Sequence, residues 1–115
     1  MWQRIFFAAM LICVVVFTAS PVLADGNPHL DAAIAHAKEA IKHGGMGHAG
    51  AVVEHAVEAL GHAKVAAKEM NNPHVDEGVS HLEEAIAHGK QGHAEVATKH
   101  AKTGLMHLKE AHYPS

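Results

Sequence analysis

The sequence predicts an all-α protein: an up-down-up-down antiparallel four-helix bundle made of two duplicated helical hairpins. Twelve of the thirteen histidines occur in triplets spaced by seven residues, which is two turns of an α-helix. The chain also repeats itself after 45 residues, and all six histidines of one half match those of the other. The four triplets are His29, His36, His43; His48, His55, His62; His74, His81, His88; and His93, His100, His107.

Local signals place the ends of each helix. Asn27 and Asn72 are good N-caps, and each is followed by proline at the first helical position, so the first and third helices begin there. Gly44 and Gly89 are expected to stop these helices, with short turns over 44–47 and 89–92. The second helix is expected from near His48 to about Met70, and the fourth from near His93 to about His112. The repeats thus span about 27–70 and 72–113.

Each predicted helix has one apolar face, and the histidines border it. In heptad terms the core occupies positions a, d and e, while every histidine of the triplets falls at g. The core is rich in alanine, so each helix buries little apolar area and only modest stability is expected without metal. The expected core residues are Leu30, Ala33, Ile34, Ala37, Ala40, Ile41; Val52, Val53, Ala56, Ala59, Leu60, Ala63; Val75, Val79, Leu82, Ala85, Ile86; and Ala94, Ala97, Ala101, Leu105, Leu108.

The N-terminal segment has the features of a secretory signal peptide. Arg4 is followed by an apolar stretch and by Val22-Leu23-Ala24, so we expect cleavage of residues 1–24 and a periplasmic mature chain, 25–115. The apolar stretch is shorter than the ~20 residues of a membrane span. The only cysteine, Cys13, lies in this segment, which excludes disulfides and thiolate ligands from the mature chain. With eight lysines against twelve acidic residues, the mature chain is an unlikely nucleic-acid binder.

Histidine is the commonest metal ligand, and the spacing dictates how these histidines can act. Seven residues separate them by ~10.5 Å along one helix, too far to share one ion, so ligands must come from two helices. Histidines at equal distances before and after each turn should lie at the same height on the two helices, which favours such level pairs within each hairpin. Pairing across the seams between the second and third helices and between the fourth and first remains an alternative. The favoured pairs are His43–His48, His36–His55, His29–His62, His88–His93, His81–His100 and His74–His107.

Two imidazoles with a carboxylate and water suit Cu(II), Ni(II) or Zn(II), and the usual affinity order favours copper. Glu39, Glu58 and Glu84 lie between histidines of one stripe and are candidate oxygen ligands, as is Met46 for a thioether contact. His112 falls outside the regular spacing and is expected to be a helix-end residue. The even repetition of one ligand pattern favours binding capacity over catalysis, and the Glu-x-x-His spacing of di-iron enzymes does not occur.

Two alternatives remain open. A pH-responsive structural protein would lose helix as its histidines become charged near pH 6, whether or not metal is present. A copper metallochaperone would need one distinct tight site and a docking surface for its partner. The uniform repeat favours neither.

The apparent signal peptide, the alanine-rich mature region without cysteine and serial heptads such as residues 29–43 resemble the small metal-binding protein family of Gram-negative bacteria. The resemblance covers essentially all of the mature region. It implies a monomeric periplasmic four-helix bundle whose heptad histidines bind several divalent cations, copper above all, and which buffers or scavenges metal.

Overall fold

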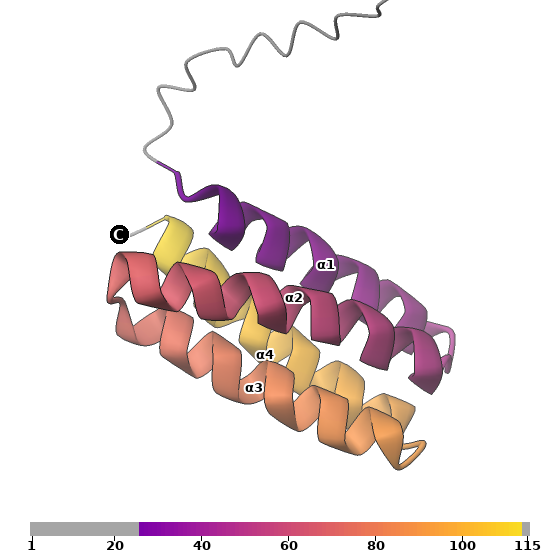
Figure 1. Cartoon of the computed structure of the whole chain (residues 1–115). Helices are drawn as coiled ribbons and strands as arrows, with labels where there is room; N and C mark the ends of the chain where they lie inside the picture. Colours follow the sequence, from indigo (N-terminus) through magenta and orange to yellow (C-terminus); the bar gives the residue numbers. More distant parts are fainter. Residues whose placement is uncertain (1–25, 114–115) are drawn as a thin grey trace, which may run out of the picture.

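The computed structural model describes residues 26–113 and consists of four α-helices. They are α1 (Pro28–Gly45), α2 (Ala49–Met70), α3 (Pro73–Lys90) and α4 (Ala94–His112). Successive helices run antiparallel, and each packs against both of its neighbours, including α1 against α4 (Figure 1). The predicted up-down-up-down bundle is confirmed. The expected signal peptide and its cleavage site lie outside the described residues, and no described helix is long and apolar enough to cross a membrane.

Asparagine and proline begin the two odd-numbered helices as predicted. The Asn27 side chain accepts hydrogen bonds from the backbone N–H groups of His29 and Leu30, at 2.9 and 3.1 Å. Asn72 accepts one from His74 N–H, at 2.9 Å. These caps satisfy N–H groups that have no partner inside the helix, and they hold the first histidine of each hairpin in a defined position.

The prediction that Gly44 and Gly89 end their helices was wrong, because both lie inside the last turn. The left-handed residues that end α1 and α3 come three positions later, at Gly47 (φ 76°) and Gly92 (φ 78°). Packing explains the earlier glycines. A Cβ atom on Gly44 would collide with the Thr98 side chain of α4, and one on Gly89 would lie 2.6 Å from Cγ2 of Val53 on α2.

The turns are Schellman motifs that hold histidines as well as helix ends. Beyond Gly47, the N–H of His48 donates to the carbonyl of His43 at 3.1 Å, and His93 N–H donates to His88 carbonyl at 3.0 Å in the second turn. In each turn, a backbone hydrogen bond therefore joins the last histidine of one helix to the histidine that precedes the next helix.

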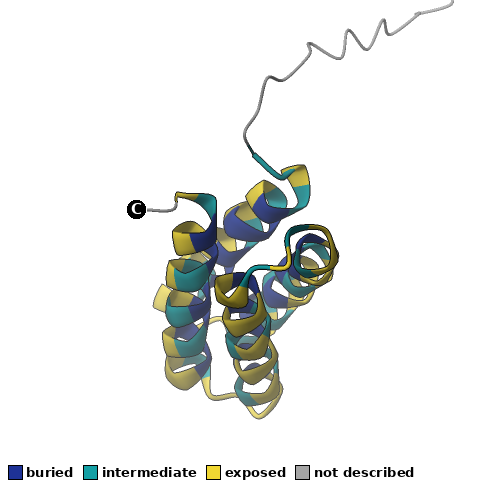
Figure 2. Ribbon diagram, turned by 90° about the vertical axis from the view of Figure 1, so that its left-hand side faces the viewer, coloured by how far each residue is buried: buried dark blue, intermediate teal, exposed yellow. Residues whose placement is uncertain are grey.

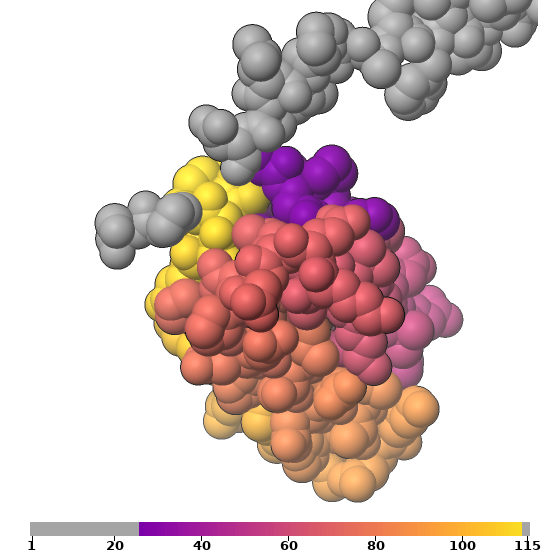
Figure 3. Space-filling view, turned by 60° about the vertical axis from the view of Figure 1, so that its left-hand side comes forward, coloured from indigo at the N-terminus to yellow at the C-terminus, as the bar shows by residue number. Residues whose placement is uncertain are grey.

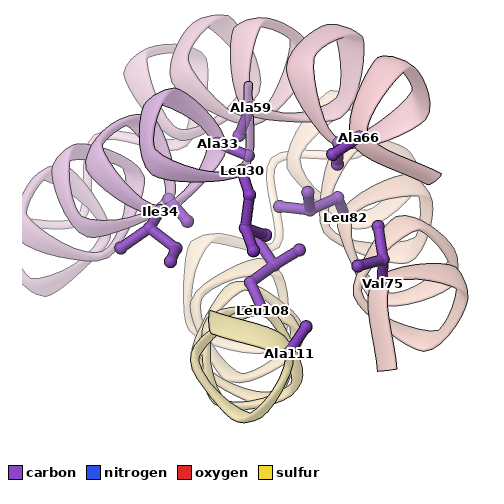
Figure 4. Close-up of a cluster of buried hydrophobic side chains, with 11 residues drawn as sticks. Leu30, Ala33, Ile34, Ala59, Ala66, Val75, Leu82, Leu108 and Ala111 are labelled. Atoms are coloured by element: carbon purple, nitrogen blue, oxygen red, sulfur yellow. The ribbon is translucent and has the colours of Figure 1, made fainter. Parts of the chain in front are cut away.

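The core forms along the interior of the bundle, where the buried faces of all four helices meet (Figure 2). The end that holds the α1 N-terminus contains the large side chains, with Leu30, Leu82 and Leu108 fully buried among them (Figure 4). The end near the hairpin turns is packed almost entirely by alanine around Val52.

Most of the expected core residues are buried. Ile41, Val53, Leu60, Val79, Ile86, Ala94 and Leu105 are only partly buried. Ala66 and Ala111, further along the same faces, are buried in addition.

Candidate metal centre

The histidine stripes of α1 and α2 face each other along the seam between these helices. The level pairs predicted from the numbering are present: ring centroids are 5.5 Å apart for His29–His62 and 6.1 Å apart for His36–His55. His43 and His48, beside the Schellman turn, are separated by 6.2 Å. The seam within the hairpin, favoured over the alternative seam between hairpins, is therefore the one that brings the histidines together.

The same arrangement recurs between α3 and α4. Centroid separations are 5.8 Å for His74–His107, 5.6 Å for His81–His100 and 6.1 Å for His88–His93. All twelve histidines of the regular spacing thus lie in two columns, one in each hairpin. We call these the first and second histidine columns.

The histidines of the two helices interleave along each column, whereas the sequence predicted separate level pairs. His36 also stacks on His62 with centroids 5.7 Å apart, and His43 stacks on His55 at 5.1 Å. In the second column, His81 stacks on His107 at 5.6 Å and His88 on His100 at 5.3 Å. Apart from the rings at the column ends, each ring of one helix enters the ~10.5 Å gap between two rings of its partner, which halves the spacing between neighbouring rings.

Several imidazole nitrogens approach one another closely. The Nδ1–Nδ1 distance is 3.2 Å for His29–His62, 3.3 Å for His81–His100 and 3.5 Å for His74–His107. Two ligand nitrogens that each lie ~2.0–2.1 Å from one ion, at a tetrahedral angle, are ~3.3–3.4 Å apart. These pairs therefore have the separation that a shared ion requires, without movement of either helix.

Carboxylates lie beside two of the diagonal histidine pairs. Donor atoms of Glu39, His43 and His55 lie within 4.8 Å of one another, as do those of the equivalent Glu84, His88 and His100. Both groups combine a glutamate with a diagonal histidine pair. Glu39 and Glu84 were candidate ligands from the sequence. The predicted level pairs did not bring Glu39 to His55 or Glu84 to His100.

The other sequence candidates occupy different settings. Glu58 reaches across the seam, with its Oε2 3.1 Å from His36 Nδ1. Met46 is 53% exposed in the first turn.

The unpaired nitrogens are consistent with a metal-binding role for the columns. Nδ1 of four histidines is buried without a hydrogen-bond partner among the described residues, in His43, His55 and His88 of the columns and in His112 outside them. A buried polar atom left unpaired costs about 1–3 kcal/mol, so coordination at these groups has unsatisfied nitrogens to use.

Sequence reasoning missed a third donor group, at the end of the second column away from the turn. His74 and His107 are joined there by Glu110, with donor atoms within 4.8 Å of one another. Glu77 adds a second carboxylate, with its Oε2 2.9 Å from His107 Nδ1. A signal was present: both helices carry His-x-x-Glu, at 74–77 and 107–110, and residues three apart share a helix face.

His112, as expected, lies outside both columns. Its Nε2 is 2.6 Å from Oδ1 of Asp31, so it joins the end of α4 to the start of α1. Figure 3 shows these two ends of the described chain in contact, with the yellow atoms of α4 against the indigo atoms of α1. This contact closes the seam opposite the one between α2 and α3.

Comparison with known proteins agrees with the donor geometry. No curated protein matches the chain, but the model of one family, described as small metal-binding protein, matches residues 2–111. That match covers nearly the whole chain, including all twelve histidines of the two columns. The four-helix fold, the paired imidazoles and this match together place the chain in the small metal-binding protein family.

Proposed function

We propose that the protein sequesters or buffers divalent cations, chiefly Cu(II) and less selectively Ni(II) and Zn(II), in the periplasm. The observation that carries this proposal is the pair of histidine columns, in which the facing Nδ1 atoms of three level pairs lie 3.2–3.5 Å apart. Imidazole nitrogens with oxygen ligands suit all three ions, and copper binds such donors most tightly. The twelve histidines are the proposed ligands.

Interleaving limits how many ions one column holds. An interior residue such as His55 faces both His36 and His43, yet one nitrogen coordinates one ion. The column therefore fills either as level pairs or as diagonal pairs, and neighbouring sites compete for shared histidines. Level pairing gives the larger capacity, and the diagonal groups add a carboxylate.

The position of the columns favours exchange over permanent retention. Most of these histidines are half-buried at the edge of the core, and His48, His74 and His93 are exposed. Ions at such sites remain accessible to solvent and to competing ligands. This accessibility, together with the repeated donor pattern, is what a buffer of metal requires, whereas catalysis needs one shielded pocket.

Periplasmic location rests on the N-terminal sequence alone. Expression in a Gram-negative host, fractionation and intact-mass measurement test it directly. A periplasmic product beginning at Asp25 supports the proposal, and a cytoplasmic product that keeps residues 1–24 contradicts it.

The binding proposal is tested by Cu(II) titration of the purified protein, followed by calorimetry and electron paramagnetic resonance. His36→Ala/His55→Ala should lose about one bound ion, because the pairs at both ends of the first column survive. Loss of two ions would indicate independent single-histidine sites. His112→Ala is the matched control, since it removes a histidine outside the columns and should leave the number of bound ions unchanged.

A further inference from the structure

The two hairpins differ at the ends of their columns that lie away from the turns. In the second column, His74 and Glu77 on α3 face His107 and Glu110 on α4. In the first column, the positions equivalent to the two glutamates are Ala32 and Val65. The pair His29–His62 thus has no carboxylate at these positions. The first hairpin therefore serves as a comparison for the site in the second.

Three donor atoms, from His74, His107 and Glu110, converge in the second hairpin, and Glu77 adds a fourth beside His107. The Nδ1 atoms of His74 and His107 are 3.5 Å apart. Glu110 Oε2 lies 2.9 Å from the first and 3.6 Å from the second. Glu77 Oε2 lies 2.9 Å from His107 Nδ1. Each helix supplies one nitrogen and one oxygen.

These distances distinguish between coordination geometries. In a square plane, any three of the four donors include a trans pair ~4.1 Å apart, given bonds of ~2.0–2.1 Å. Among His74, His107 and Glu110 no donor pair exceeds 3.6 Å. A tetrahedral ion needs every pair at ~3.3–3.4 Å, and the three observed pairs, at 2.9, 3.5 and 3.6 Å, lie on either side of this value. Glu77, which contacts His107 alone, would complete the set by turning toward the other donors.

Charge also favours a cation here. With neutral imidazoles the group carries two negative charges, and Nδ1 of His107 has a single hydrogen to offer two carboxylates and one imidazole. A divalent cation neutralises both carboxylates and accepts electron pairs from all four atoms. The His107 side chain is only 16% exposed, so this neutralisation takes place partly out of water.

We propose that His74, Glu77, His107 and Glu110 form one tetrahedral site for a divalent ion with the chemistry of Zn(II). Unlike the histidine-only pairs, this site uses two nitrogens and two oxygens and favours Zn(II) over the tetragonal geometry of Cu(II). The proposal rests on the proposed function only in that the columns bind divalent ions, and it assigns this end of the second column a different specificity.

Titration with Co(II) tests the site, because Co(II) occupies zinc sites and absorbs visible light far more strongly in tetrahedral coordination. The wild-type protein should show this absorption for its first equivalent of Co(II). Glu77→Gln/Glu110→Gln should abolish it and weaken the tightest Zn(II) binding by at least about tenfold. Glu83→Gln/Glu95→Gln is the charge-matched control on the same helices, since these glutamates pair with lysines, and it should behave as wild type.

The reciprocal variant, Ala32→Glu/Val65→Glu, adds the missing carboxylates to the first hairpin and should gain a second tetrahedral Co(II) equivalent. Equal Co(II) spectra for the wild type and Glu77→Gln/Glu110→Gln would overturn the proposal. So would a folded Ala32→Glu/Val65→Glu protein that gains no such spectrum. Failure of the proposed function is a separate result, in which the wild type takes up no Cu(II) that depends on His36 and His55.

Discussion

His43 and His55 stack across the seam between α1 and α2, with ring centroids 5.1 Å apart and ring planes inclined by 10°. They are not the pair that level numbering about the turn selects, which is His43 with His48. The contact exists because the two stripes interleave, and it brings both rings to the carboxylate of Glu39.

His43 and His48 should therefore differ in their importance for Cu(II) binding. His43→Ala removes a ring that contacts both His48 and His55, whereas His48→Ala leaves the group of Glu39, His43 and His55 intact. We expect the first substitution to weaken Cu(II) binding in competition titrations more than the second. Equal effects of the two substitutions would contradict the diagonal site.

The carboxylates of the diagonal groups should contribute to affinity. Glu39→Gln/Glu84→Gln keeps the side-chain shape but removes a charged oxygen donor from each group. We expect Cu(II) bound there to weaken by about tenfold, measured by competition with a chelator of known affinity. Glu54→Gln/Glu83→Gln removes the same charge from exposed positions outside these groups and should leave the affinity unchanged.

Metal should stabilise the fold, because the paired histidines are held together only in the native state. At a free Cu(II) concentration of 100 times Kd, one site adds about 2.7 kcal/mol, which raises Tm by about 10 °C or more for a domain of this size. Thermal melts followed by circular dichroism measure the increase, and a chelator should reverse it. Coordination displaces protons from the ligands, so the increase should become smaller as the pH is lowered. A Tm that does not respond to Cu(II) at pH 7.5 would count against the proposed function.

Two glycines should respond to alanine in opposite directions. Gly89→Ala places a Cβ atom 2.6 Å from Val53 and should lower the free energy of unfolding by about 1–3 kcal/mol. Gly61→Ala, on an exposed turn of α2 with nothing within 4 Å of the new atom, should raise it by up to about 1 kcal/mol. Urea unfolding without metal compares the two. If Gly89→Ala is as stable as wild type, the close contact between α2 and α3 is not what keeps glycine at this position.

Much of the fold follows from local features. Asn27 and Asn72 with their prolines mark helix starts, and Asn71, which is left-handed at φ 48°, ends α2 where the sequence placed the connector. The helix-ending glycines of α1 and α3 were placed three residues early, at Gly44 and Gly89 instead of Gly47 and Gly92. Gly44 and Gly89 resemble helix stops in sequence, but contact with a neighbouring helix is what requires glycine there.

By itself, the sequence determined the four helices and the stripe of histidines along each, because a spacing of seven residues and the apolar face depend only on the helical period. Only the tertiary structure decided that the stripes meet within each hairpin, that they interleave, and that Glu77 and Glu110 join the pair His74–His107. The physical reason is that helical periodicity sets the direction of each side chain about its own axis. The stagger between two packed helices, which sets the distances between ligands, comes from contacts across the bundle.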